Sequence, residues 1–137
     1  MIWDPFHAAA EKQLEARSLR DGSGLVDNHQ FYLARGDYAK QHPQVIGTLV
    51  EEIRSVGEEA KTDVQQATAQ IAPLIGLPAD ITALALSRQQ YNTQFVTPEV
   101  VEAQQKIADT FADLKLIPKR LSIKDVVWTP PAKVAQH

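Results

Sequence analysis

Residues 3–10 read Trp-Asp-Pro-Phe-His-Ala-Ala-Ala, and this stretch places the start of a helix close to the beginning of the chain. Asp4 can accept backbone N–H bonds as an N-cap, and Pro5 suits the first helical position, where its missing N–H costs nothing. The three alanines favour continuation of the helix. Such a junction normally follows a strand, and only two residues precede Trp3. We therefore expect the chain to be the second part of a larger α/β protein.

The composition is that of an ordinary globular domain. Of the 137 residues, 44% are hydrophobic and 23% are charged, which are normal fractions. The net charge of −3 and the lack of a basic cluster argue against nucleic acid as a partner. The absence of cysteine excludes disulfides and thiol catalysis. Because Trp3, Asp4 and Pro5 interrupt any early apolar run, we expect no signal peptide in this chain.

Hydrophobic spacing and capping residues predict a mainly helical chain. Thr62 with Gln65 predicts a capping box, and Gly76 predicts the end of the helix that follows it. The clearest strand candidate is the apolar stretch at 30–34, and 17–21 is a lesser one. An α/β chain dominated by helices, without the strands that its helices would cover, is therefore expected. Helices are expected at 4–15, 43–59, 62–75, 78–87 and 97–115, with single turns at 37–40 and 122–125.

Nothing in the sequence predicts catalysis or metal binding. The four histidines lack the spacing of a zinc-binding pair on a helix, and there are no cysteines to join them. Gly22-Ser23-Gly24 lacks the lysine of a phosphate-binding loop, and no nucleophile elbow occurs. The carboxylates of the helix at 43–59 are interpreted as a solvated face. We expect no enzymatic activity, no catalytic residue, no bound metal and no cofactor. The histidines are His7, His29, His42 and His137.

Two segments suggest recognition of a ligand. Trp3 and Asp4 lie at a helix N-terminus, where free N–H groups favour an anion. The alternative is that Asp4 is only a cap and Trp3 only a core residue. The second segment, Asp-Asn-His-Gln at 27–30, leads into the strand candidate, where polar side chains often line a cleft. An ordinary solvated turn explains this segment equally well.

At these segments the chain resembles the periplasmic aliphatic sulfonate-binding proteins of ABC importers, in the sulfonate, taurine and nitrate group. The similarity runs in order from Ile2 to about Pro130, and the ordered set of motifs is fairly specific although no single motif is diagnostic. The first and third motifs resemble the sulfonate branch most. The motifs are Ile-Trp-Asp-Pro-Phe at 2–6, Leu-Arg-Asp-Gly at 19–22, Asn-His-Gln-Phe-Tyr-Leu-Ala at 28–34, Tyr-Ala at 38–39, His-Pro at 42–43, Gly-Leu-Pro at 76–78, Gln-Gln-Lys-Ile-Ala-Asp at 104–109, Leu-Ile-Pro-Lys at 116–119 and Val-Trp at 127–128.

The resemblance implies a two-lobed, type II periplasmic-binding-protein fold, with ligand held between the lobes. It implies that this chain is the C-terminal portion, well under half of the usual length. Residues 1–34 would be the end of the second lobe and the strand crossing back to the first. Residues 35–129 would be the helical part that packs on the first lobe, and 130–137 a disordered tail.

By the same resemblance, the function implied is that of a fragment of the importer's substrate-binding component. The ligand would be an aliphatic sulfonate or related small anion, bound weakly by the fragment alone, and the full-length protein would engage an ABC permease. The localisation implied is periplasmic, or cytoplasmic if the chain is expressed as it stands. The residues facing the cleft would be Trp3, Asp4, Asn28, His29 and Gln30.

A second hypothesis is a truncated helical interaction or structural protein, derived from that family, that binds no ligand. Under either hypothesis we expect a homodimer. The strand candidate at 30–34 and the apolar faces of the helices at 43–59 and 97–115 lack the sheet that would cover them, and exposed apolar patches and unpaired strand edges favour self-association.

Overall fold

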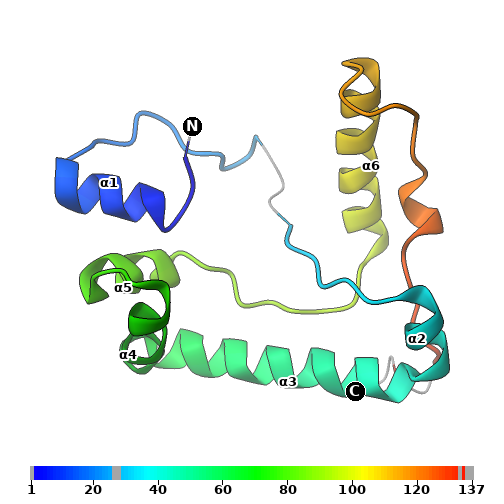
Figure 1. Cartoon of the computed structure of the whole chain (residues 1–137), viewed down its shortest axis with the longest axis horizontal. Coiled ribbons are helices and arrows are strands. Elements are labelled where there is room, and N and C mark those ends of the chain that lie inside the picture. Colours follow the sequence, from blue (N-terminus) through cyan, green and yellow to red (C-terminus); the bar gives the residue numbers. More distant parts are fainter. Residues whose placement is uncertain (1, 26–28, 133, 135–137) are drawn as a thin grey trace. The chain divides into compact units, whose positions relative to one another are not determined.

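The computed structural model describes residues 2–25, 29–132 and 134, and it is dominated by helices. Of the described residues, 58% are helical and none forms a strand. The helices are joined by short turns and by longer non-helical segments (Figure 1). They are α1 (Phe6–Leu14), α2 (Gly36–Gln41), α3 (Pro43–Thr62), α4 (Val64–Ile75), α5 (Ala79–Ser87), α6 (Pro98–Asp113) and the short 3₁₀ helix η1 (Ile123–Asp125).

Two helix boundaries follow the predicted capping residues. The Thr97 hydroxyl accepts the Val100 N–H at the start of α6, and Gly76 ends α4 with φ 68°. The predicted capping box at Thr62 is wrong by one residue, because the Asp63 carboxylate is the cap of α4 and accepts the Gln66 N–H at 2.9 Å. Thr62 instead ends α3, where its hydroxyl donates to the carbonyl of Glu58. Two adjacent residues could cap here, and the stronger acceptor does so.

The two strand predictions are wrong for the described part of the chain. Residues 17–21 and 30–34 form no strand, and Figure 1 draws both as thin connecting segments. A strand is defined by ladder hydrogen bonds to a neighbouring strand, and an apolar, aromatic composition cannot supply that neighbour. Both segments therefore keep a strand-like sequence without strand pairing.

The chain divides into two compact units. Unit 1 comprises Met1–Asp21 and Glu52–Thr93, and therefore holds α1, the second part of α3, α4 and α5. Within it α5 packs against both α4 and α1. The core of this unit is small and consists of the buried residues Ala8, Ile81 and Ala85 with the partly buried Ala9, Leu77 and Leu84 around them.

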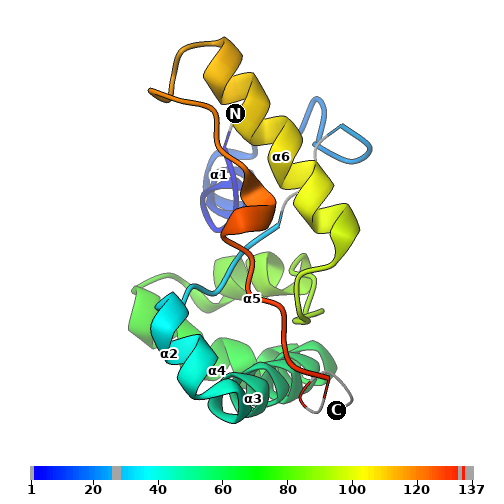
Figure 2. The same ribbon diagram turned by 90° about the vertical axis from the view of Figure 1, so that its right-hand side faces the viewer.

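Unit 2 comprises Gly22–Glu51 and Gln94–His137, and it contains α2, the first part of α3, α6 and η1. The segment around η1 lies along α6 in both views of the ribbon (Figures 1 and 2). Gln105 of α6 fixes it there, because its side-chain amide donates to the Leu121 carbonyl at 2.9 Å and its side-chain oxygen accepts the Ile123 N–H at 2.9 Å. Arg120 adds ion pairs to Asp109 and Asp113.

The predicted division of the chain at residues 34 and 129 refers to the lobes of a complete binding protein. The two compact units do not test that division, so it stays a prediction. The predicted disordered tail at 130–137 falls partly outside the described residues, at positions 133 and 135–137.

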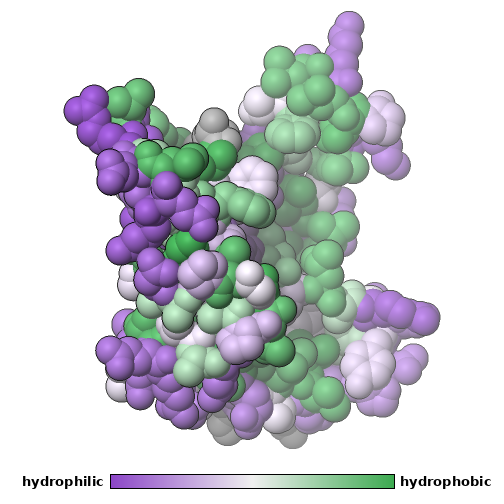
Figure 3. Space-filling view, turned by 60° about the vertical axis from the view of Figure 1, so that its left-hand side comes forward, coloured by the Kyte–Doolittle hydropathy of each residue, from purple (hydrophilic) through white to green (hydrophobic). Residues whose placement is uncertain are grey.

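Large apolar side chains remain exposed in both units. Figure 3 shows hydrophobic residues scattered among hydrophilic ones over much of the face in view. Leu33 is 93% exposed and Leu74 is 84% exposed, although side chains of this kind normally fill a core. Among the described residues no single helix is long and apolar enough to cross a membrane, and only the bent pair α4 and α5 would pass by length and composition.

Candidate functional site

The first predicted recognition segment lies at the N-terminus of α1, in unit 1. The helix begins at Phe6, two residues later than predicted, and Pro5 rather than Asp4 occupies the N-cap position. Pro5 has no side-chain acceptor, and Asp4 takes over that task, because its Oδ1 atom accepts the Ala8 N–H at 3.0 Å. Asp4 therefore caps the helix, as the sequence predicted, but from one position further out.

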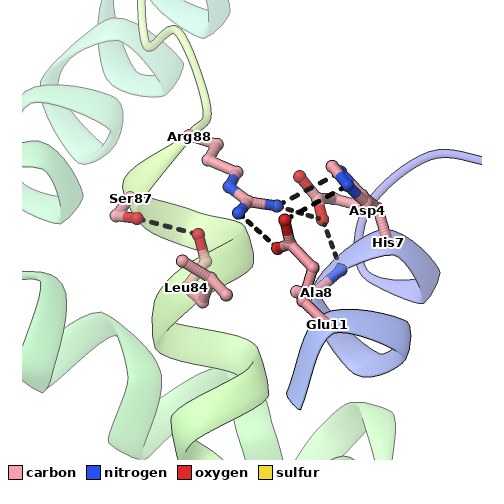
Figure 4. A network of polar contacts seen from close by, with 7 residues as sticks. All are labelled: Asp4, His7, Ala8, Glu11, Leu84, Ser87 and Arg88. Atoms are coloured by element: carbon pink, nitrogen blue, oxygen red, sulfur yellow. Dashed lines mark hydrogen bonds and ion pairs between the residues drawn. The ribbon is translucent and has the colours of Figure 1, made fainter. Parts of the chain in front are cut away.

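Asp4 also belongs to a polar network centred on Arg88, which follows the last residue of α5 (Figure 4). One terminal nitrogen of the guanidinium lies 2.5 Å from Glu11 Oε2. The other lies 3.5 Å from Asp4 Oδ1 and 3.2 Å from His7 Nδ1. His7 Nε2 is in turn 3.4 Å from Glu11 Oε1. Arg88 thus contacts Asp4, just before α1, and His7 and Glu11 on one face of α1.

The electrostatics of this network follow from the same contacts. The hydrogen bond from Arg88 holds the pKa of Glu11 below its ordinary value. The hydrogen bond to Glu11, followed by the charges of Asp4 and Glu11, raises the pKa of Arg88. The positive charge of Arg88 is therefore balanced by two carboxylates and is not available to an external anion.

Sequence reasoning missed Arg88. The partners on α1 have a recognisable spacing, since Asp4, His7 and Glu11 fall at i, i+3 and i+7, which is one face of a helix. Ala8, the buried residue of α1, lies on the same face. That pattern predicts a docked polar face on α1, but it does not identify a cation 77 to 84 positions away in the sequence.

Trp3 stands beside this network and faces outward. It is 71% exposed, and its ring meets the edge of the Phe6 ring with centroids 6.2 Å apart and planes at 82°. Phe6 is itself 60% exposed. The interpretation of Trp3 as only a core residue is therefore wrong for this structure. Trp3 and Phe6 together form an exposed aromatic surface at the start of α1.

The second predicted recognition segment belongs to unit 2. His29 and Gln30 are exposed, and the His29 ring lies 6.4 Å from the Phe31 ring. Asn28 and its neighbour Asp27 lie outside the described residues. The two predicted segments therefore belong to different compact units, and the structure brings together Trp3 with Asp4, and His29 with Gln30, as separate pairs.

A shallow open groove of about 370 Å³ follows the second segment and involves α2. Arg35 lines it, but its guanidinium is paired with Asp37 at 2.5 Å, so the charge is again balanced. Among the residues that the structure describes, no three His, Asp or Glu side chains come together to hold a metal ion.

The fold defines the class of protein: the chain corresponds to a helix-rich portion of the two-lobed fold of periplasmic binding proteins. No family model matches the sequence. The chain superposes on the periplasmic aliphatic sulphonate-binding protein SsuA of Escherichia coli with a TM-score of 0.90 and 32% identity, covering 95% of this chain and 42% of that one. The alkanesulfonate-binding protein SsuA of Xanthomonas axonopodis pv. citri, bound to MOPS, gives a TM-score of 0.83 and 27% identity, over 93% of this chain and 44% of that one.

Sequence relatives agree with the structural ones. An aliphatic sulfonates-binding protein of Escherichia coli (strain K12) is 33% identical over 130 residues, which are 94% of this chain and 41% of the relative. A protein of the same description from Bacillus subtilis (strain 168) is 22% identical over 92% of this chain and 38% of its own length. The chain thus spans about two fifths of the relatives it matches. The predicted resemblance to aliphatic sulfonate-binding proteins and the predicted fold class are confirmed, and the relatives are binding proteins rather than enzymes.

Proposed function

We propose that this chain is part of the substrate-binding component of an ABC importer for aliphatic sulfonates, and that it has no catalytic role. The observation that carries the proposal is the match to the Escherichia coli protein, at 32% identity and a TM-score of 0.90 over 95% of the chain. The bound MOPS of the second structural relative supports it, because MOPS is itself an alkanesulfonate. For the complete protein we propose a periplasmic location and an ABC permease as partner.

We further propose that both recognition segments belong to the ligand site. Asn28, His29 and Gln30 carry polar groups that suit sulfonate oxygens, and the exposed ring of Trp3 suits a hydrocarbon chain. Asp4 belongs to the site in a different way. Its carboxylate and a sulfonate have the same charge, and its Oδ1 atom already accepts the Ala8 N–H. We therefore assign Asp4 to shaping the segment.

The chain alone should bind sulfonates weakly or not at all. A binding cleft buries most of its ligand, whereas Trp3, His29 and Gln30 are exposed. A sulfonate is well solvated by water and gains little from groups that water also reaches.

Calorimetry tests the proposal in two arms. The chain is titrated with a series of alkanesulfonates, alone and together with the part of the Escherichia coli relative that it does not span. We expect no micromolar affinity for the chain alone and measurable affinity in the mixture, reduced by Trp3→Ala and absent for an alkylammonium of the same length. Micromolar affinity of the chain alone would show that it carries a whole site. No binding in either arm would favour the second function.

The second candidate function is a helical interaction protein, derived from the same family, that binds no sulfonate. The observation that favours it is the number of exposed apolar side chains in both units, among them Leu33, Val56 and Leu116. Such surfaces favour association. For this case, and for the isolated chain in general, we propose a homodimer.

A further inference from the structure

We infer that Arg88 is the positioning residue of the Trp3 segment: it clamps α1 to the end of α5 and so holds Trp3 and Phe6 as an aromatic surface for the hydrocarbon part of an alkanesulfonate. This inference rests on the proposed function for its ligand, and on the geometry of unit 1 for its clamp.

The clamp reaches from Asp4, just before α1, to Glu11 in its second turn. One terminal nitrogen of Arg88 holds Glu11 at 2.5 Å, and the other lies between Asp4 at 3.5 Å and His7 at 3.2 Å (Figure 4). The two terminal nitrogens of the guanidinium fork therefore contact Glu11 and the Asp4–His7 pair separately. A fork is suited to this task, since lysine offers a single ammonium and cannot keep both contacts in the same geometry.

The clamp matters because the apolar contact between α1 and α5 is small. α1 has nine residues, which is too short to be stable as an isolated helix in water. Ala8 is its buried side chain, with Ala9 partly buried beside it, and both have little apolar surface to contribute. Its larger apolar residues, Phe6 and Leu14, are exposed at 60% and 76%. The docking of α1 on α5 therefore combines a small apolar contact around Ala8 with the ionic contacts of Arg88.

Holding Asp4 in place also positions the aromatic surface, because Trp3 and Phe6 lie on either side of Asp4 in the sequence. Asp4 lies between Trp3 and Phe6 in the sequence, and its carboxylate is held by both the Ala8 N–H and Arg88. The Trp3 and Phe6 rings are in contact with each other. Rings held in this way present apolar area at a low entropic cost, which suits a flexible hydrocarbon chain.

The first experiment tests the clamp without any ligand. Hydrogen exchange of the Ala8 amide and the indole N–H resonance of Trp3 are measured by NMR in the chain and in Arg88→Gln. We expect exchange of the Ala8 amide to become about tenfold faster, as loss of hydrogen bonds to charged groups implies, and the Trp3 signal to move, while the Thr82 amide in α5 keeps its protection. Unchanged exchange at Ala8 overturns the inference.

Two variants make this result specific. Arg54→Gln is the matched control, because Arg54 donates to the Thr93 carbonyl in the same unit but stands outside the network of Figure 4. It should leave Ala8 and Trp3 unchanged. Arg88→Lys should restore part of the protection at Ala8, whereas a purely steric role of residue 88 would give full restoration or none.

The second experiment tests the aromatic surface. The Trp3 indole resonance is followed during titration with butanesulfonate and hexanesulfonate at millimolar concentrations. We expect a shift that grows with chain length and is reduced in Arg88→Gln. Absence of a shift, or a shift that ignores chain length, overturns the inference. Sulfonate binding seen by calorimetry without a response of Trp3 would overturn it while leaving the proposed function in place. An equal response to hexanol would keep the aromatic surface and count against a sulfonate-binding function.

Discussion

At the scale of single residues, Gly76 shows how one backbone angle fixes the turn between α4 and α5. It ends α4 with φ 68°, a left-handed conformation that side-chain-bearing residues rarely adopt, and open space surrounds it. Gly76→Ala should therefore destabilise the chain by strain alone, by about 1 kcal/mol. Gly36→Ala is the control, because Gly36 also faces open space but lies in a helix without a positive φ. Urea unfolding of both variants decides the matter, and equal midpoints would contradict the prediction.

The Gln105 side chain forms hydrogen bonds with two backbone groups near η1. Its amide nitrogen donates to the Leu121 carbonyl, and its amide oxygen accepts the Ile123 N–H. One side chain therefore pairs with a backbone acceptor and a backbone donor in the segment at the start of η1. Gln105→Ala should cost about 1 to 2 kcal/mol and loosen this segment from α6. Lys106→Ala, at an exposed neighbouring position of the same helix, should have little effect. Exchange of the Ile123 amide measures the loss, and a protected amide in Gln105→Ala would count against this role.

At the scale of elements, the docking of α1 should weaken in acid. The titratable and charged groups that meet there are Asp4, His7 and Glu11 on one side and Arg88 on the other. Arg88 lowers the pKa of Glu11 in the folded chain. A carboxylate with a lowered folded pKa stabilises fully above its ordinary value, 4.5 for Glu11, and that stability is lost as the pH falls through the folded value.

An NMR titration of the Trp3 indole N–H from about pH 6 to about pH 3 checks this sign. We expect a transition below the ordinary pKa of a glutamate, and a smaller one in Glu11→Gln. Glu15→Gln serves as the control, since Glu15 follows the helix and stands outside the Arg88 network. The same acid transition in the chain and in Glu11→Gln would show that Glu11 does not hold the helix.

The elements also show what a single sequence can and cannot predict. Helix ends were predictable because their causes are local: a cap such as Thr97 and a stop such as Gly76 lie within a turn of the groups that they satisfy. Strands were not, because pairing at 30–34 depends on a partner far away in the sequence. Arg88 was not predictable for the same reason, because its partner Asp4 is 84 positions away in the sequence. Of the candidate site, the capping role of Asp4 was predictable and its clamp was not.

At the scale of the whole molecule, the exposed surface area is larger than that of a compact protein of the same mass. The chain exposes 10919 Å², whereas a compact protein of its mass exposes about 7,100 Å². Two separate compact bodies of half that mass would together expose about 8,600 Å², which is also less than the chain exposes. This excess of roughly 2,300 to 3,800 Å² is of the size buried in obligate interfaces.

Sedimentation equilibrium on the purified chain tests this consequence. We expect a mass above that of the monomer at micromolar concentration, with a homodimer as the simplest closed assembly. Replacing exposed apolar residues by charged ones, as in Leu33→Lys with Leu116→Lys, should shift the equilibrium toward monomer. Lys124→Glu, at an exposed position, is the control for a change of charge without the loss of an apolar side chain. A persistent monomer that unfolds cooperatively would show that each unit closes its own core.

The unpaired segment at 29–35 also has a consequence for proteolysis. A protease needs a few residues of accessible, extended backbone. Residues 29–35 form neither helix nor strand, so no backbone hydrogen bonds of that kind protect them from cleavage. Tyr32 and Leu33 are 70% and 93% exposed, and both suit the specificity pocket of chymotrypsin. Leu74 is 84% exposed but lies in α4, so brief digestion should cut after residues 32 and 33 and spare it. The strand-like sequence would then mark where the chain is first cut, and a partner that supplied the missing ladder would be detected as protection from chymotrypsin.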